Sequence, residues 1–222
     1  MRQRLWYSLT VSAVLWASLV GARETDPGCG VSSTPPDQMI TECTAQIQAL
    51  GENSALYQYY DKRGLAYVRK GDYDRAIADF DESVRRHPGP EEYSFRGYAY
   101  DAKGDYDRAI QDFDEAIRIG IYDSDSNAWN LRGNSYRHKG DYDRAIRNYD
   151  HALELVTKHV DNVGWQIHAR FLNNRALAKQ AKGDVEGANA DFAEAKRIDR
   201  LIRCSTSPRN VLVENCLSAG RR

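Results

Sequence analysis

The sequence predicts an all-α protein in which helix hairpins stack side by side as a solenoid. An octapeptide, Lys-Gly-Asp-Tyr-Asp-Arg-Ala-Ile, occurs unchanged at residues 70–77, 103–110 and 139–146, and a worn copy occupies 182–188. On both sides of its glycine, apolar residues return every three to four positions, as amphipathic helices require. Because single hairpins cannot bury these apolar faces alone, we expect the core to lie between neighbouring repeats.

The octapeptide predicts a helix stop followed at once by a helix start. Its glycine can adopt the left-handed conformation that ends a helix, and the aspartate after it can cap the next helix. The turn glycines are Gly71, Gly104, Gly140 and Gly183, and the capping aspartates are Asp72, Asp105, Asp141 and Asp184. Each repeat therefore holds two antiparallel helices, and successive turns lie 33, 36 and 43 residues apart.

Small and aromatic residues recur at fixed distances from these turns. Seven residues before the turn glycine stand Gly64, Gly97, Gly133 and Ala176, and nine residues after it stand Phe80, Phe113, Tyr149 and Phe192. Five residues after it stand Ala76, Ala109, Ala145 and Ala188. We expect the two helices of a repeat to approach closely at the small residues, with the aromatic ring filling the space beside them.

These columns resemble the tetratricopeptide repeat, whose pattern has Gly and Tyr on the first helix, Ala, an aromatic residue and Ala on the second, and Pro at the exit. Pro88 stands at that exit in repeat one. The resemblance covers about residues 54–200 and implies a right-handed α-solenoid of four repeats, at about 57–90, 90–123, 126–160 and 169–202. Repeat four lacks both Gly and Tyr in its first helix, so we expect a looser terminal unit.

One departure from the family pattern is an arginine in place of the usual leucine just before the first-helix glycine. It recurs as Arg63, Arg96, Arg132 and Arg175. An acid eight residues past the turn glycine accompanies it, as Asp79, Asp112 and Asp191, with Asn148 in repeat three. We expect these side chains to pair between the two helices of each repeat rather than to form a ligand-binding ladder.

The two ends of the array are predicted to be capped. In segment 23–53, a helix is expected from Thr34-Pro-Pro-Asp37 to Gly51, with Met39, Ile40, Cys43 and Ile47 at the spacing that the second helices use. It would cover the exposed face of repeat one. In segment 201–222, a short helix from Ser207-Pro208 through Cys216 would cover repeat four.

The longer spacing between repeats three and four predicts an extended helix. We expect the second helix of repeat three to continue past Leu155 through Val156 and Val160, and the chain to turn near residues 161–164. An insertion at this place changes the local superhelix and could shape a binding site, and a simple length variant is the alternative.

Residues 1–22 have the pattern of an export signal. Arg2 and Arg4 supply the positive start, Leu5 to Val20 an uncharged and largely apolar stretch, and Val20-Gly21-Ala22 the small residues at a cleavage site. An uncleaved membrane anchor is the alternative, although the apolar run is shorter than the roughly 20 residues that a bilayer crossing needs. We therefore expect an exported protein, periplasmic or secreted.

The cysteines agree with an oxidising compartment. Four are present, and they lie as two pairs outside the repeats, Cys29 with Cys43 and Cys204 with Cys216. Three connectivities are possible, and the local pairing would close each end of the solenoid. A zinc site is disfavoured, because no Cys-x-x-Cys occurs and no histidine lies near either pair in the sequence.

The resemblance also implies where a ligand would bind. In the family, first helices line the concave face, and the residues in the corresponding columns include Gln58, Asp61, Tyr98, Asn127, Asn130, Asn134, Arg137, Arg170 and Asn173. Because an amide can both donate to and accept from an extended backbone, Asn130, Asn134 and Asn173 are the candidates for peptide binding. A solvated helix face without a ligand is the alternative.

The sequence shows no pattern for catalysis or for a cofactor. The five histidines have no metal-ligand spacing, and no Gly-x-Ser-x-Gly, P-loop or dinucleotide fingerprint occurs. Taking Arg2 and Arg4 from the 31 basic side chains leaves 29 against 32 acidic ones, a charge of −3 that does not favour nucleic acid or an anionic membrane. We expect no metal, cofactor or small-molecule substrate.

Three functions remain in order of preference. The first is an exported, non-catalytic scaffold that binds a protein or an extended peptide in its concave groove. The second is a structural subunit that packs through its convex face or its ends within an envelope assembly. The third is an enzyme or a subunit of one, with the insertion at 156–168 as the place to seek a catalytic cluster.

Overall fold

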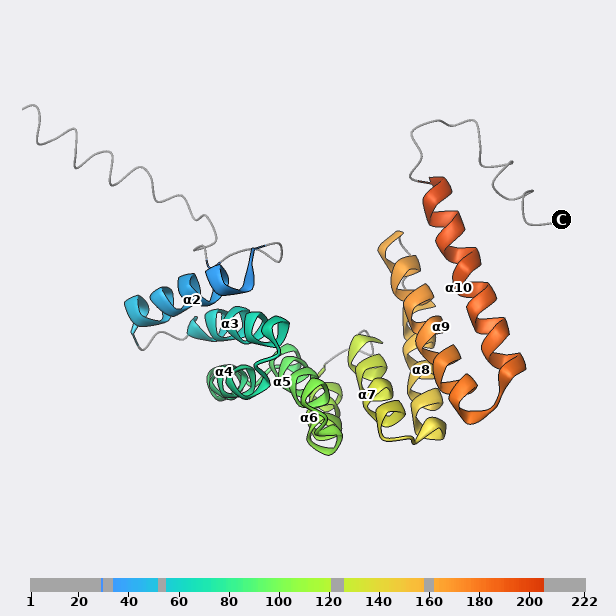
Figure 1. Cartoon of the computed structure of the whole chain (residues 1–222), viewed down its shortest axis with the longest axis horizontal. Helices are drawn as coiled ribbons and strands as arrows, with labels where there is room; N and C mark the ends of the chain where they lie inside the picture. The colour runs from blue at the N-terminus through green and yellow to red at the C-terminus, as the bar shows by residue number, and fades with distance from the viewer. Residues whose placement is uncertain (1–28, 30–33, 52–54, 121–125, 158–161, 206–222) are drawn as a thin grey trace, which may run out of the picture.

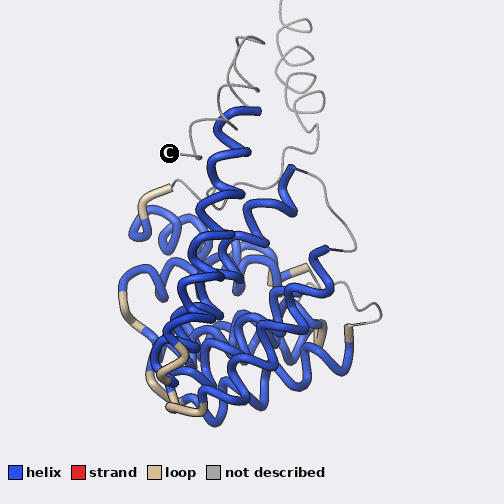
Figure 2. The backbone as a smooth tube through the Cα atoms, turned by 90° about the vertical axis from the view of Figure 1, so that its right-hand side faces the viewer, coloured by secondary structure: helices blue, strands red, loops and turns tan. Residues whose placement is uncertain are grey.

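The structure is a computed structural model that describes Cys29 and residues 34–51, 55–120, 126–157 and 162–205. All regular structure in these ranges is helical, which confirms the all-α prediction (Figures 1 and 2). The helices are α2 (Pro36–Leu50), α3 (Leu56–Lys70), α4 (Tyr73–Arg86), α5 (Pro90–Lys103), α6 (Tyr106–Ile119), α7 (Ser126–His138), α8 (Tyr142–Thr157), α9 (Asn162–Lys182) and α10 (Val185–Ser205).

The helices form hairpins that stack in chain order. The pairs α3–α4, α5–α6, α7–α8 and α9–α10 pack tightest, and the second helix of each hairpin packs on the first helix of the next. Among the described helices, contacts between non-consecutive ones join only first helices: α3 with α5, α5 with α7, and α7 with α9. The described helices therefore form one solenoid, and its first helices share one face (Figure 1).

The turn between the helices of each repeat has the geometry that the octapeptide predicts. Gly71 has φ 77°, and its amide donates to the carbonyl of Val68 over 2.9 Å. The carboxylate of Asp72 accepts from the amide of Arg75 at 3.3 Å and so caps α4. The other turn glycines have φ of 90°, 81° and 94°. Since a side chain is strained in this conformation, each turn requires glycine.

The octapeptide also joins neighbouring turns, a role that the sequence analysis did not predict. Its lysine reaches back to the second aspartate of the preceding copy. These pairs are Lys103 with Asp74, Lys139 with Asp107, and Lys182 with Asp143, each with N–O distances of 2.5 Å. The pairs are exposed, so each contributes only a few tenths of a kcal/mol to about 1 kcal/mol. The lysine and the second aspartate of the octapeptide thus have the same role at each of these junctions.

The glycines of the first helices lie against the aromatic rings of the second helices, as predicted. A Cβ atom at Gly64 would stand 2.7 Å from the Phe80 ring, and one at Gly133 would stand 2.7 Å from the Tyr149 ring. Both rings are fully buried. Glycine therefore sets how closely the two helices approach at these points.

Arginine pairs within each repeat as predicted, and it also reaches the preceding repeat. Arg96 donates to both carboxylate oxygens of Asp112 at 2.8 and 2.7 Å, and its third nitrogen donates to Asp81 at 2.8 Å. Asp81 belongs to α4, the second helix of the preceding repeat. The corresponding partners are Asp79 and Thr44 for Arg63, Asn148 and Asp114 for Arg132, and Asp191 and Asp150 for Arg175. One side chain thus holds three helices together.

Replacing Arg96 by lysine is expected to destabilise the array by about 2 kcal/mol, the contribution of a hydrogen bond between charged groups. Lysine cannot present the planar fork that holds Asp112 and Asp81 at once. Urea unfolding followed by circular dichroism measures the change. The matched control is Arg85→Lys, at an exposed pair with Glu82, with an expected loss below about 0.5 kcal/mol. Equal losses for the two variants would contradict the bridging role.

The N-terminal helix covers repeat one as expected. Helix α2 begins at Pro36, ends before Gly51 and packs on α3. Cys43, Met39 and Leu56 are buried in one cluster with Cys29, and the structure joins Cys29 to Cys43 with a Cα–Cα distance of 4.8 Å. Cys216 and the expected short helix at 207–216 lie outside the described residues, so the structure does not test the second pair.

The junction of repeats three and four differs from the prediction in one respect. Helix α8 continues past Leu155 to Thr157, as expected, and Val160 lies outside the described residues. However, α9 begins at Asn162 and includes Gly164. The prediction of a turn that extends to residue 164 is therefore wrong. The insertion therefore lengthens the first helix of repeat four. Phe171 and Leu172 from this helix are buried with Val156 and Ile198.

Candidate functional site: a groove on the first helices

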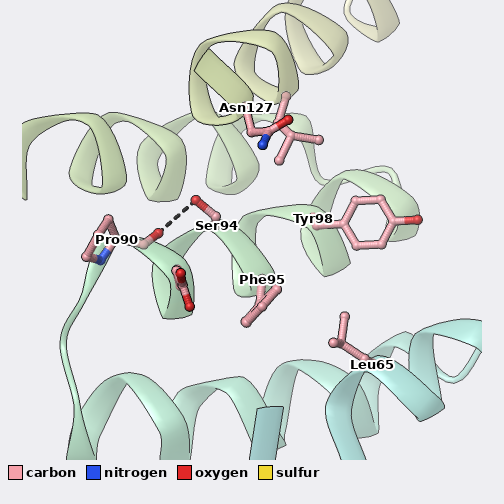
Figure 3. A pocket seen from close by; sticks show the side chains of 8 residues that line it. Leu65, Pro90, Ser94, Phe95, Tyr98 and Asn127 are labelled. Carbon is pink, nitrogen blue, oxygen red and sulfur yellow. Dashed lines mark hydrogen bonds between the residues drawn. The ribbon is translucent and has the colours of Figure 1, made fainter. Parts of the chain in front are cut away.

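A pocket of about 650 Å³ opens on the face that the first helices share (Figure 3). Its lining residues come from α3, α5 and α7. They are Leu65, Pro90, Glu91, Ser94, Phe95, Tyr98, Asn127 and Leu131. Figure 3 shows Leu65, Phe95, Tyr98 and Asn127 on the first helices of three successive repeats, around the same space. The pocket therefore exists only because three repeats are stacked.

Helix α5 contributes most of the lining because its residues follow helical spacing. Glu91, Phe95 and Tyr98 are separated by four and three positions, which places them on one side of the helix. The helix begins at Pro90, and Ser94 Oγ donates to the Pro90 carbonyl over 2.7 Å. The Ser94 hydroxyl is thus held by its own helix. Tyr98 remains 43% exposed, which is unusual for so large a ring.

Tyr98 and Asn127 are the two predicted site residues that line this pocket. Asn127 is exposed, and its Oδ1 accepts from Arg170 Nη2 over 2.8 Å, so α7 and α9 are linked along the same face. Gln58 is also exposed, near the start of α3. Tyr98, Asn127, Arg170 and Gln58 therefore present side chains to solvent on the first helices.

The amides proposed for peptide binding are mostly engaged in holding the fold. Asn130 is only 4% exposed, and its Oδ1 accepts from Asn174 Nδ2 over 2.8 Å. The Oδ1 of Asn134 accepts from the Tyr149 hydroxyl over 2.8 Å. The expectation that Asn130 lies free on the groove surface is therefore wrong, because it is packed between α7 and α9. Asn173 is half-buried, and its role in binding stays a prediction.

Arg137 lies in a polar cluster rather than on an open surface. Its Nη2 lies 3.0 Å from His138 Nε2, and His138 Nδ1 lies 3.1 Å from Asp101 Oδ1. The Ser135 hydroxyl donates to the same oxygen of Asp101 over 2.7 Å. The Nε of Arg137 is buried without a hydrogen-bond partner. This cluster connects α5 with α7.

Asp61, another predicted groove residue, is instead buried at the junction of repeats one and two. It is 7% exposed, and its Oδ1 has no hydrogen-bond partner. The pKa of Asp61 is raised to about 7, mainly by burial and also by the nearby Glu92 and Glu91, while a hydrogen bond from Ser83 lowers it. Glu92 is also buried, and His87 Nδ1 lies 2.9 Å from its Oε1. Asp61 therefore belongs to the core of the junction.

Leu65, Glu91 and Ser94 stand in the same family columns as the predicted groove residues. The other three lining residues, Pro90, Phe95 and Leu131, were not predicted from the sequence. A signal for two of them was present, because Phe95 follows Glu91 by four positions and Leu131 follows Asn127 by four. Residues four apart lie on the same side of a helix, so these side chains border the groove columns. Within the described part of the chain, no group of three or more His, Cys, Asp or Glu side chains is arranged to hold a metal ion.

Comparison with known families agrees with this arrangement. Two family models, each described as tetratricopeptide repeat, match residues 62–126 and 126–156. These stretches contain the octapeptide turns at 70–77, 103–110 and 139–146. The chain is a tetratricopeptide-repeat protein. No curated protein matches it.

Solved structures share the fold of this tetratricopeptide-repeat protein. A crystal structure of MamA has a TM-score of 0.58 at 21% identity, over 74% of this chain and 88% of that one. MamA from Desulfovibrio magneticus RS-1 has a TM-score of 0.60 at 16% identity, over 78% and 88%. A Podosopora anserina putative kinesin light chain with nearly identical TPR-like repeats has 0.62 at 14% identity, over 78% and 89%. At these identities the likeness shows the fold alone.

Proposed function

We propose that this tetratricopeptide-repeat protein is an exported, non-catalytic scaffold that binds a protein or an extended peptide along its first helices. The repeat fold indicates a role in protein interaction. The observation that carries the proposal is the pocket across α3, α5 and α7, where the large aromatic ring of Tyr98 is exposed to solvent. Exposed aromatic side chains beside polar ones are typical of surfaces that bind other proteins.

The surroundings of the histidines support a non-catalytic role. Each histidine that the structure describes packs its ring against an aromatic ring. The pairs are Tyr57 with His87, Tyr106 with His138, Trp129 with His151, and Trp165 with His168. None of these rings is paired with a serine, threonine or cysteine nucleophile in the described residues, as acyl transfer would require. The histidines therefore serve packing and hydrogen bonding.

The groove can be tested by selecting binders from a library of random extended peptides with the folded protein as bait. The groove variant replaces Tyr98, Asn127 and Arg170 by alanine, and its matched control replaces Gln111, Arg147 and Lys196, exposed residues of second helices, by alanine. We expect selected peptides to bind the control variant normally and the groove variant at least tenfold more weakly. Peptides that lose affinity only for the control variant would contradict binding on the first helices.

Export is proposed from the pattern of residues 1–22 and from the cysteine pairs. Of the helices that the structure describes, none combines the length and the apolar character that a membrane crossing needs. The disulfide between Cys29 and Cys43 is consistent with an oxidising compartment. In this proposal the mature chain lacks residues 1–22 and is periplasmic or secreted.

Alkylation of the protein from its native compartment tests this proposal. Without reduction, we expect no cysteine to be modified, because both pairs are oxidised. After denaturation and reduction, all four cysteines should react, which serves as the control. Mass spectrometry of the intact chain also reports whether residues 1–22 are missing. Two or more reactive thiols before reduction would argue against the pairing.

A further inference from the structure

We infer that the pocket between α3, α5 and α7 selects a peptide segment in which a large apolar side chain is flanked by lysine or arginine. This inference rests on the proposed function and specifies the chemistry of the ligand. It follows from the composition of the pocket walls and from the charges at its edge.

The walls of the pocket suit one large apolar side chain. Leu65 from α3, Phe95 and Tyr98 from α5 and Leu131 from α7 surround it. Phe95 is held in place by stacking on the buried Phe80, with ring centroids 5.9 Å apart. Because this wall is rigid and apolar, an aliphatic or aromatic side chain that enters the pocket loses water contact without losing hydrogen bonds. Polar side chains would lose hydration without compensation.

The edge of the pocket carries negative charge. Glu91 is the only charged residue among those that line it, and it is exposed. A cation next to the apolar side chain would therefore be attracted to Glu91, and an anion there would be repelled.

A cation on the same face is held at the wall of the pocket that α7 forms. Arg170 lies on α9, and its guanidinium donates to Asn127 at the far wall of the pocket. The charge pattern along the face is thus acidic at α5 and basic at α9. A peptide with a basic residue beside its apolar anchor complements the α5 end, where the pocket lies.

Fluorescence anisotropy with three labelled peptides tests the inference. The probe has the core Lys-Leu-Phe-Lys between Gly-Ser spacers, the second peptide has Glu-Leu-Phe-Glu, and the third has Lys-Ser-Ser-Lys. We expect the first to bind the full folded chain at least tenfold more tightly than either of the others. The Glu91→Gln variant should weaken the first peptide three- to tenfold, and Tyr98→Ala should weaken it tenfold or more.

The controls separate this inference from the proposed function. Glu186→Gln removes an exposed acid from α10 and should leave the affinity for the first peptide unchanged. Equal or tighter binding of the Glu-Leu-Phe-Glu peptide, or no effect of Glu91→Gln on a folded variant, would overturn the inference. If that acidic peptide bound with sensitivity to Tyr98→Ala, the groove function would stand and only the ligand chemistry would be wrong. Failure of all random peptides to bind would contradict the groove function itself.

Discussion

Replacing Gly97 by alanine is expected to destabilise the protein by about 2 kcal/mol, although alanine is the better helix former by about 1 kcal/mol. A Cβ atom at this position would stand 2.9 Å from the ring of Phe113 and 3.2 Å from the carbonyl oxygen of Ala109. Phe113 is fully buried, so its ring has no free space to occupy. The two helices of repeat two must therefore move apart, which weakens the packing of both neighbouring repeats.

Urea unfolding followed by circular dichroism measures this loss, and a double variant provides the control. Phe113→Leu alone should also destabilise, because it removes part of a buried ring. In the Gly97→Ala/Phe113→Leu double variant, the smaller leucine leaves room for the new methyl group, so its loss of stability should be smaller than the sum of the two single losses. Repeat four offers a natural comparison, since it has Ala176 at the position of the glycine and the half-buried Phe192 at the position of the ring. Additive losses would show that the contact with the Phe113 ring does not limit how closely the two helices approach.

Replacing Asp61 by asparagine is expected to stabilise the protein at pH 8 relative to the wild type, by an amount that grows between about pH 4 and pH 7 and then levels off. The pKa of Asp61 is raised from its ordinary value of 3.8 to about 7 in the folded state, mainly by burial. The folded protein therefore holds a proton that the unfolded chain releases. The stability from this proton is complete below about pH 4 and is lost as pH rises towards 7. Asparagine carries no charge, so the variant does not suffer this loss.

The expected difference between the two proteins changes by roughly 3 kcal/mol between pH 4.5 and pH 8. Urea unfolding at several pH values in this range measures it. His87, Glu91 and Glu92 face Asp61 in both proteins, so their own titration largely cancels in the comparison. The matched control is Asp74→Asn, which removes an exposed carboxylate and should change the stability by less than about 1 kcal/mol. A wild-type to Asp61→Asn difference that stays constant with pH would contradict the burial of a protonated acid.

Of the two partners of the recurrent arginine, the sequence predicts one and not the other. The partner within the repeat could be predicted, because an acid accompanies the arginine at a fixed distance and becomes Asn148 in repeat three. The second partner, such as Asp81 for Arg96, was missed, although an acid recurs ten residues past the turn glycines of the first three repeats, as Asp81, Asp114 and Asp150. This contact depends on how far one hairpin is shifted along the next. That shift is a property of packing between repeats.

The predicted groove residues also divide into those that the sequence places correctly and those that it does not. The family columns place Tyr98 and Asn127 correctly at the pocket, because their position on the first helix decides which side they occupy. The same columns fail for Asp61 and Asn130. These residues are on the expected helices, but neighbouring side chains such as Asn174 cover them. Exposure depends on the bulk of neighbours that are distant in the sequence.

The sequence by itself determined the repeat, the turn at each glycine, the capping aspartates and the contact between glycine and aromatic ring. These features rest on interactions within one hairpin, and each hairpin repeats the same local pattern. Only the tertiary structure decided which first-helix residues remain open to a ligand, which acids are buried, and how each arginine and lysine joins one repeat to the next. The reason is that these features arise between hairpins, where the curvature of the array and the side chains of two or three repeats determine burial together.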